Sequence, residues 1–316
     1  MERRSVVIGG GGLTATTAVG TLRERGFDGR IALVAVERHE PYIRPPLSKG
    51  YLAGCDGLDE VFVHPSSWYT DNAVELLLGT RVDEVDPGAR SVRLGGGTLR
   101  YDGLLLATGA TSRRLRVPGA EREDVDVLRT IDDSDHLGAV PADLVVVGVG
   151  AVPAVALAAG IGLPTANGIE VGGSMATSAP GVCAADDVAD AYLPAIERRL
   201  RSEHWANAIT GGRIAARGML GERISYNEIS YFYNDQYDRG MEYSGYAPLT
   251  QGAEVVYRGD PDAQEFLAFW TRGGWVVAGI SLNVWDVNDQ VQRIIRTGKR
   301  VDSASLADVD IPLSTL

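Results

Sequence analysis

The chain has 316 residues, enough for two domains, and its 45% hydrophobic and 23% charged residues are typical of a globular protein. A net charge of −12 argues against a nucleic-acid partner and gives no support for binding to an anionic membrane surface. Cys55 and Cys183 have the spacing of neither a zinc site nor a redox pair, and we predict no metal site. Since no apolar run reaches signal or membrane-spanning length, we expect a cytoplasmic protein.

The N-terminus has the pattern of a dinucleotide-binding β–turn–α–β unit. A short apolar strand at 5–8 enters the glycine-rich turn GGGLTA, and a helix follows. In this G-x-G-x-x-A pattern, Gly10 makes the turn, Gly12 lets the backbone approach a pyrophosphate, and Ala15 lets the helix pack on the strand.

A second strand, in "GRIALVAVE", is predicted to close on Glu37. An acid at this distance from the glycine turn can accept hydrogen bonds from the ribose hydroxyls of a nucleotide. The alternative is an ordinary glycine turn followed by a solvent-exposed acid at a strand end.

The middle of the chain starts with a proline-rich loop, "EPYIRPPLSKGYLAG", and continues as a small β-meander that ends in a buried strand at 104–107. A linker and a short helical stretch follow at 112–140. The apolar run from Pro141 then enters Gly148-Val149-Gly150. Pro153 stands where a second dinucleotide fingerprint requires Gly or Ala, so this stretch is predicted to be a strand and turn without a nucleotide.

In the last third of the chain, the sequence pattern changes near residue 222, where we place a domain boundary. Before it, "GVCAADDVA" reads as an apolar strand ending in acids, and "EHWANAITGGRIAARGML" as a helix. After it, aromatic alternating segments run to about residue 278, and an amphipathic helix follows.

Several of these segments together resemble the FAD-dependent reductases that serve ferredoxins and rubredoxins in oxygenase-type systems. The matching motifs are "PYIRPPLSKGYL", "LLLATGA", "LRTIDD", "TSAPGVCAADDVA", "EHWANA", "NDQYD", "MEYSGYA" and "NVWDV", in the family's order. The resemblance implies an α/β fold: a Rossmann-like FAD-binding domain, with a parallel sheet and a β-meander, and a C-terminal α+β reductase-type domain. The implied domains are 1–221 and 222–316.

The resemblance also implies FAD contacts at matching positions: Gly10, Gly12, Ala15, Glu37, Arg44, Lys49, Val82, Ala107, Thr108, Gly109, Arg129, Asp187 and Trp205. Two of these are candidate catalytic residues. Lys49 would lie near the reactive N5 edge of the flavin, and Trp205 would border its pyrimidine end beside a helix N-terminus that stabilises negative charge. The alternatives are solvated loop cations for Arg44 and Lys49 and a core position for Trp205.

The family also has a nicotinamide-binding domain between the two halves of its FAD-binding domain, and here that domain is expected to be deleted. "LRTIDDSDHLGAV" runs almost directly into "PADLVVVGVG", so roughly 100 residues are absent, about one domain. The halves would be about 1–112 and 165–221, joined by a remnant at about 113–164.

Two departures from the family pattern fall in the expected cofactor site. Asp186 replaces the glycine of the family's Gly-Asp pair, and a carboxylate facing the FAD phosphates would weaken binding through like charge. Gly211 stands where the family often has glutamine. These changes fit either a reshaped pocket or relaxed constraint.

We therefore expect an FAD-dependent oxidoreductase without its own NAD(P)H domain, acting on a small organic substrate at the exposed flavin face. The alternatives are a redox-neutral, FAD-containing cyclase or isomerase and a non-catalytic binding protein on a reductase scaffold. NAD(P)H is not expected as a partner. An iron–sulfur partner is disfavoured, because such proteins are usually acidic and this chain is too, although a local basic patch could overcome that. A homodimer is left open.

Overall fold

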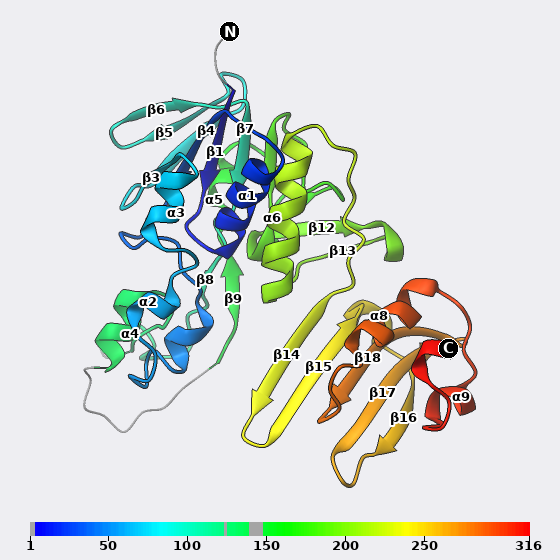
Figure 1. Ribbon diagram of the computed structural model, residues 1–316. Coiled ribbons are helices and arrows are strands. Elements are labelled where there is room, and N and C mark those ends of the chain that lie inside the picture. Colours follow the sequence, from blue (N-terminus) through cyan, green and yellow to red (C-terminus); the bar gives the residue numbers. More distant parts are fainter. Residues whose placement is uncertain (1–3, 123–124, 139–147) are drawn as a thin grey trace. The chain divides into compact units, whose positions relative to one another are not determined.

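The computed structural model describes residues 4–122, 125–138 and 148–316 (Figure 1). These residues group into two compact units. Within the described residues, the first unit extends to Glu203 and resumes at Ala208–Tyr226, and the second comprises His204–Asn207 and Asn227–Leu316. The proposed halves of the FAD-binding domain and the boundary near residue 222 stay predictions.

The first unit is built on a five-stranded parallel sheet with the order β11-β7-β1-β2-β3. Its strands are β1 (Ser5–Gly9), β2 (Arg30–Val34), β3 (Val74–Leu77), β7 (Gly103–Leu106) and β11 (Val182–Ala184). The strands are apolar almost throughout because both faces of the sheet are covered. One expected boundary was wrong: β2 ends at Val34 rather than at Glu37, and Glu37 lies in the loop that follows.

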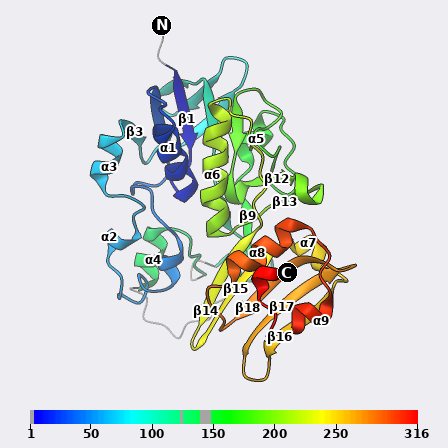
Figure 2. The same ribbon diagram turned by 45° about the vertical axis from the view of Figure 1, so that its right-hand side comes forward.

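Two helices cover one face of this sheet. Helices α1 (Leu13–Glu24) and α6 (Trp205–Met219) run side by side in two views (Figures 1 and 2). A side chain at Gly212 would place its Cβ 2.6 Å from the carbonyl oxygen of Thr14. The helices can therefore approach this closely only because residue 212 has no side chain.

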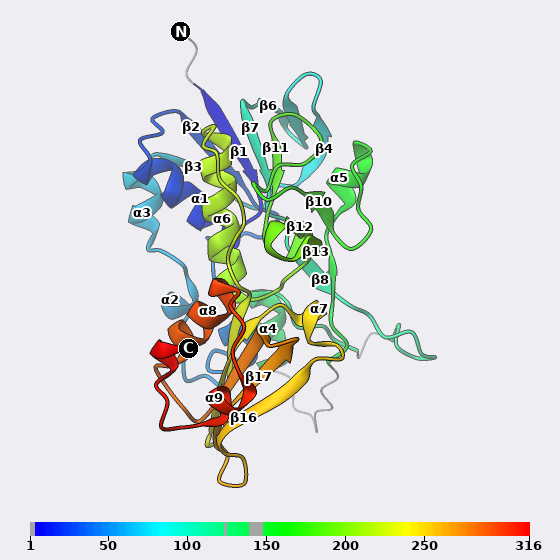
Figure 3. The same cartoon turned by 90° about the vertical axis from the view of Figure 1, so that its right-hand side faces the viewer.

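The expected meander lies on the opposite side of the sheet, together with a short helix (Figure 3). Strands β4 (Val82–Asp86), β5 (Ser91–Leu94) and β6 (Gly97–Arg100) form an antiparallel sheet, and α5 (Ala156–Gly160) packs against β4. A further three-stranded sheet contains β10 (Ile169–Val171), β12 (Ala189–Leu193) and β13 (Arg198–Leu200).

A small apolar cluster holds the proline-rich loop. Tyr42, Leu47, Val61 and Ile131 are buried together. The cluster joins the turn η1 (Pro45–Ser48) and helix α2 (Leu58–Val61) to the start of α4 (Ile131–Gly138). Helix α3 (Ser66–Asp71) packs near β3.

Two short strands mark where the chain leaves and re-enters the sheet region. β8 (Ala110–Ser112) pairs antiparallel with β9 (Ala151–Pro153). The predicted strand that starts at Pro141 falls largely on residues 139–147, which lie outside the described residues. Residues 148–150, with the Gly-Val-Gly sequence, have no regular structure before β9.

The second unit has an antiparallel sheet with the order β14-β15-β18-β17-β16. Its elements are β14 (Tyr231–Gln236), β15 (Arg239–Gly245), α7 (Ala247–Thr250), β16 (Glu254–Asp260), β17 (Glu265–Arg272), β18 (Trp275–Leu282), α8 (Asn288–Thr297) and α9 (Ser303–Ala307). Phe269, Val291 and Ile294 are buried in its core. The expected fold class, a Rossmann-like domain followed by an α+β domain, is confirmed. In the described parts of the chain, none of the helices combines the length and apolarity needed to cross a bilayer.

The contact at Gly212 predicts a stability effect. Gly212→Ala should lower the free energy of unfolding by about 1–2 kcal/mol, because the added methyl group overlaps a backbone carbonyl and outweighs the gain in helix propensity. Gly20→Ala, inside α1, is the matched control. Its Cβ would lie 3.7 Å from the Trp68 ring, an ordinary contact, so it should raise stability by up to about 1 kcal/mol. Thermal unfolding followed by circular dichroism measures both. Equal effects of the two variants would contradict the close packing of α1 on α6.

Candidate functional site

The candidate site lies at the carboxyl edge of the parallel sheet. Four parallel strands end there, and each is followed by residues predicted to contact FAD: the glycine turn after β1, Glu37 beyond β2, Ala107–Gly109 after β7 and Asp187 after β11. The register of the sheet aligns these ends, since Gly9 pairs with both Val34 and Leu106, and Leu106 pairs with Ala184. Ligands of open α/β sheets bind at this edge.

The glycine turn combines one crowded glycine with one open glycine. Gly10 has a φ of +145°, and a Cβ there would lie 2.0 Å from the carbonyl oxygen of Ala107. A Cβ at Gly12 would meet no atom within 4 Å, although Gly12 is the N-cap of α1. Ala15, in the first turn of α1, is fully buried. The open space therefore faces the N-terminal N–H groups of α1, where a phosphate binds favourably.

Glu37 has protein partners in this structure. Its carboxylate pairs with the Arg44 guanidinium at 2.7 Å and accepts a hydrogen bond from the Tyr42 hydroxyl. Arg44 also donates to Tyr42 and to the carbonyl oxygen of Arg129. Burial and the hydrogen bond to Glu37 raise the pKa of Tyr42. The structure thus brings together Glu37 and Arg44, and it adds Tyr42, which the sequence reasoning missed although it stands two residues before Arg44.

Arg129 and Asp187 form the second charged pair of the site. An Arg129 Nη atom lies 3.4 Å from the Asp187 carboxylate. Burial, and then the nearby cation of Arg44, lower the pKa of Arg129. The backbone of Arg129 is held by Asp133, which accepts its N–H at the start of α4. Arg201, also missed from the sequence, donates to the carbonyl oxygen of Asp187, and no motif pointed to it.

The loop after β7 is braced by the segment that contains β9. Thr108 donates its hydroxyl to the carbonyl oxygen of Ala154, and the N–H of Ala154 donates to Gly109. Gly109 has a φ of +64°, and a Cβ there would lie 3.3 Å from an Arg129 Nη atom. Val82 also lies close, because a Cβ at Gly9 would sit 3.8 Å from its side chain.

The two candidate catalytic residues are placed differently from these. Lys49 is exposed beside the turn at 45–48, and its ammonium makes no hydrogen bond or ion pair with other described residues. The turn itself is anchored, since the Ser134 hydroxyl donates to the carbonyl oxygen of Leu47. Trp205, the first residue of α6, is 40% exposed and groups with the second unit, so its role stays a prediction.

Two observations test whether these residues fit an FAD molecule. The first is the unfilled space at Gly12, which would let the cofactor backbone approach the helix end. The second is the Nε atom of Arg129, which is buried without a hydrogen-bond partner among the described residues. Because buried donors are nearly always satisfied, such an atom is typical of a site that receives a polar ligand. The residues therefore fit FAD.

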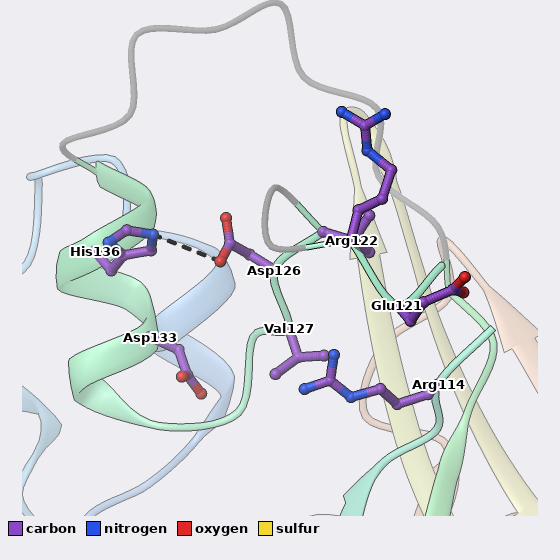
Figure 4. Close-up of a pocket in the computed structure, with 8 residues that line it drawn as sticks. Arg114, Glu121, Arg122, Asp126, Val127, Asp133 and His136 are labelled. Carbon is purple, nitrogen blue, oxygen red and sulfur yellow. Dashed lines mark ion pairs between the residues drawn. The ribbon is translucent and has the colours of Figure 1, made fainter. Parts of the chain in front are cut away.

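The stretch that includes residues 114–136 carries a separate polar hollow of about 390 Å³ (Figure 4). Its lining includes Arg114, Asp126, Asp133 and His136, and Asp126 faces His136 at 3.5 Å. Of these residues, Asp133 connects to the site through the backbone of Arg129. The hollow is thus a neighbour of the site rather than part of it.

Comparison with known families identifies both units. The profile of the family "pyridine nucleotide-disulphide oxidoreductase" matches residues 4–140 and 136–212, and a "reductase C-terminal" profile matches residues 231–316. Members of the first family bind FAD, so the expected cofactor is confirmed.

Similar proteins extend along the whole chain. The ferredoxin–NAD(+) reductase component of the anthranilate 1,2-dioxygenase system of Burkholderia cepacia is 30% identical over 406 positions, covering 100% of both chains. The ferredoxin reductase subunit of the 5,5'-dehydrodivanillate O-demethylase of Sphingobium sp. is 28% identical over 404 positions, covering 98% of this chain and 97% of that protein. Both alignments are longer than this chain, so both contain gaps in it.

Solved structures give the same result. A ferredoxin reductase from Rhodopseudomonas palustris matches with a TM-score of 0.90 and 28% identity, over 98% of this chain and 99% of that one. The covalent putidaredoxin reductase–putidaredoxin complex matches with a TM-score of 0.89 and 25% identity, over 99% and 98%.

These relatives correct two expectations about partners. We expected no role for NAD(P)H and disfavoured an iron–sulfur partner, but one relative is named a ferredoxin–NAD(+) reductase component, and one structural match is a complex with putidaredoxin. The argument from charge failed because the net charge of a chain does not determine the field at one docking surface. On both profiles, the chain belongs to the pyridine nucleotide-disulphide oxidoreductase family and is an FAD-dependent oxidoreductase with a C-terminal reductase domain.

Proposed function

We propose that this protein exchanges electrons between a bound FAD and a ferredoxin-type iron–sulfur protein. The observation that carries the proposal is the end-to-end similarity to ferredoxin reductases, which includes both the FAD-binding part and the C-terminal reductase part. When bound, FAD supplies the redox chemistry, since its ring accepts a hydride and passes on single electrons.

The residues of the site divide the work of holding the cofactor. The N–H groups at the start of α1 bind the pyrophosphate through the open space at Gly12. Glu37 binds the adenosine ribose. Its carboxylate gives up its contact with Tyr42 or Arg44 and accepts hydrogen bonds from the ribose hydroxyls instead. Asp187, oriented by Arg129, accepts a hydrogen bond from a ribityl hydroxyl. Lys49 is available to face the negative charge that the reduced ring carries.

We infer further that the nicotinamide-binding module between the halves has been deleted. Strands β8 and β9 pair with only residues 113–150 between them, a stretch too short to fold as a separate domain without cross-links. The gaps in the alignments agree with this inference. Without the module, one face of the flavin is open to reactants from solution.

The open face favours a second candidate function, oxidation of a small organic substrate that binds there directly. In this version, electrons leave the substrate for the FAD and then pass to dioxygen or an external carrier. It differs from the first proposal in the donor that reduces the flavin.

A local group of arginines supports docking of an acidic partner despite the net charge. Arg113, Arg114 and Arg116 are all exposed in the segment after β8. Arg113 is fixed to the carbonyl oxygen of Ala151 in β9, and Arg114 lines the hollow in Figure 4. Such a patch steers an acidic protein at low salt.

The first test is reduction of the FAD-loaded protein under anaerobic conditions. A reduced [2Fe–2S] ferredoxin should bleach the visible flavin absorbance, with equivalent oxidation of the ferredoxin, at a rate that falls as NaCl is added. Arg114→Gln combined with Arg116→Gln should slow the reaction at least about threefold at low salt, whereas Arg100→Gln, on exposed β6, should not.

Parallel reactions contain NADH, NADPH or a set of small alcohols, amines and thiols in place of the ferredoxin. Bleaching by one of the organic compounds alone would select the second candidate. If the ferredoxin leaves the flavin oxidised at every salt concentration, the proposed electron exchange is wrong.

The cofactor assignment has its own test at Gly12. Gly12→Ala should raise the dissociation constant for FAD at least about tenfold, because the methyl group fills the space left for the pyrophosphate. The apoprotein should lose less than about 1 kcal/mol of stability, the value of a weak N-cap. Gly160→Ala, also in open space, should change neither quantity. Quenching of FAD fluorescence measures the binding, and an unchanged affinity in Gly12→Ala would remove this turn from the site.

A further inference from the structure

Asp186 is the residue at the sheet edge that the site described above does not use. It stands two residues beyond the end of β11, between Ala185 and Asp187, and has a left-handed backbone with a φ of +74°. Few residues other than glycine adopt this region readily, and aspartate and asparagine are the main exceptions. The left-handed backbone at position 186 therefore favours only a few residue types there, among them Gly, Asn and Asp.

The carboxyl group of Asp186 lies against the start of α1. The Thr14 hydroxyl, in the first turn of that helix and two residues after Gly12, is close enough to lower the pKa of this carboxyl, although among the described residues its Oγ1 atom is buried without a hydrogen-bond partner. Thr14 is itself buried. Asp186 is thus placed beside the same N-terminal turn that faces the space for the pyrophosphate.

Helix α6 closes the other side of this position. A Cβ at Gly211 would lie 3.4 Å from both the backbone N of Asp186 and the Cβ of Ala185. Gly212 lets the same helix reach the carbonyl oxygen of Thr14. Two consecutive glycines therefore bring α6 against both the backbone at Asp186 and the start of α1.

The charges that act on Asp186 disfavour its ionised form. Burial, and then the adjacent Asp187 carboxylate, raise its pKa to about 7, while the Thr14 hydroxyl and the N–H of Asp187 oppose the shift. Helix α1 approaches it through Thr14 and helix α6 through Gly211, and neither residue is charged. The adjacent Asp187 is paired with Arg129, and no cation in the part of the chain that the structure describes contributes to the pKa shift at Asp186.

We propose that Asp186 belongs to the pyrophosphate site and must be neutral when FAD binds, so that FAD binding takes up one proton from solvent. An ionised carboxylate at this helix end would repel the phosphates and would itself occupy the favourable end of the α1 dipole. The neutral acid removes that repulsion and has a hydrogen to donate. This inference concerns how the cofactor is held and is independent of the electron partner.

The pH dependence follows from linkage. Above the pKa of Asp186, FAD binding requires a proton that the free protein has lost, so the dissociation constant should rise about tenfold per pH unit between pH 7.5 and 8.5. Below that pKa, the affinity should be level. The apoprotein adds a second effect: between the unfolded-state pKa of about 4 and about pH 7 the folded chain binds more protons than the unfolded one, so its stability falls as the pH rises through that range and levels off above it.

The test compares wild type with Asp186→Asn and Asp190→Asn. Asparagine is a neutral replacement that tolerates the left-handed backbone, whereas Asp190 is a buried carboxyl in β12 outside the site. Isothermal titration of each apoprotein with FAD at pH 8, in buffers of different ionisation enthalpy, gives the affinity and the number of protons taken up.

Wild type and Asp190→Asn should take up close to one proton, and Asp186→Asn none. Asp186→Asn should bind FAD with an affinity that varies less than about twofold from pH 6 to 8.5. Its melting temperature, relative to wild type, should rise more at pH 8 than at pH 6. Proton uptake unchanged by Asp186→Asn, a level wild-type affinity, or no FAD binding at pH 6 by either protein would each overturn the proposal.

Discussion

The site depends on one close approach between two backbones. The carbonyl oxygen of Ala107 sits where a side chain at Gly10 would begin, so the turn after β1 and the loop after β7 meet with nothing between them. This contact aligns the ends of two adjacent parallel strands, and the start of α1 then points across the sheet edge. With any side chain at residue 10, the loop and the helix could not keep this arrangement.

Most of this arrangement was readable from the chain because it depends on local patterns. The glycine turn, the buried strands, the meander and the motif-bearing loops all have short-range signatures, and the order of the motifs indicated the family. The end of β2 could not be predicted, because apolar residues continue past Val34 although the backbone stops pairing with β1 there. Neither were Tyr42 and Arg201, whose importance comes from partners brought together by tertiary structure.

The charged residues of the site form two ion pairs that are linked to each other, rather than isolated ions. Glu37 with Arg44 and Asp187 with Arg129 are each partly buried, and Arg44 also binds the backbone of Arg129. On the site proposed above, an entering cofactor would exchange these contacts for its own, so its binding would reorganise a network instead of filling an empty polar site. The sequence indicated these four residues, but not that they form ion pairs with one another before a cofactor binds.

The pairing of β8 with β9 has a consequence for how such proteins change over time. The two strands join residues about 40 positions apart in sequence, and their ladder is made between residues 110–112 and 151–153. Because the entropy of closing a loop grows only with the logarithm of its length, adding or removing chain at this point costs about 0.6 kcal/mol for each doubling. On the deletion inferred above, the strand pair is the point at which a whole module was replaced by a short connection while the nucleotide-binding sheet kept its register.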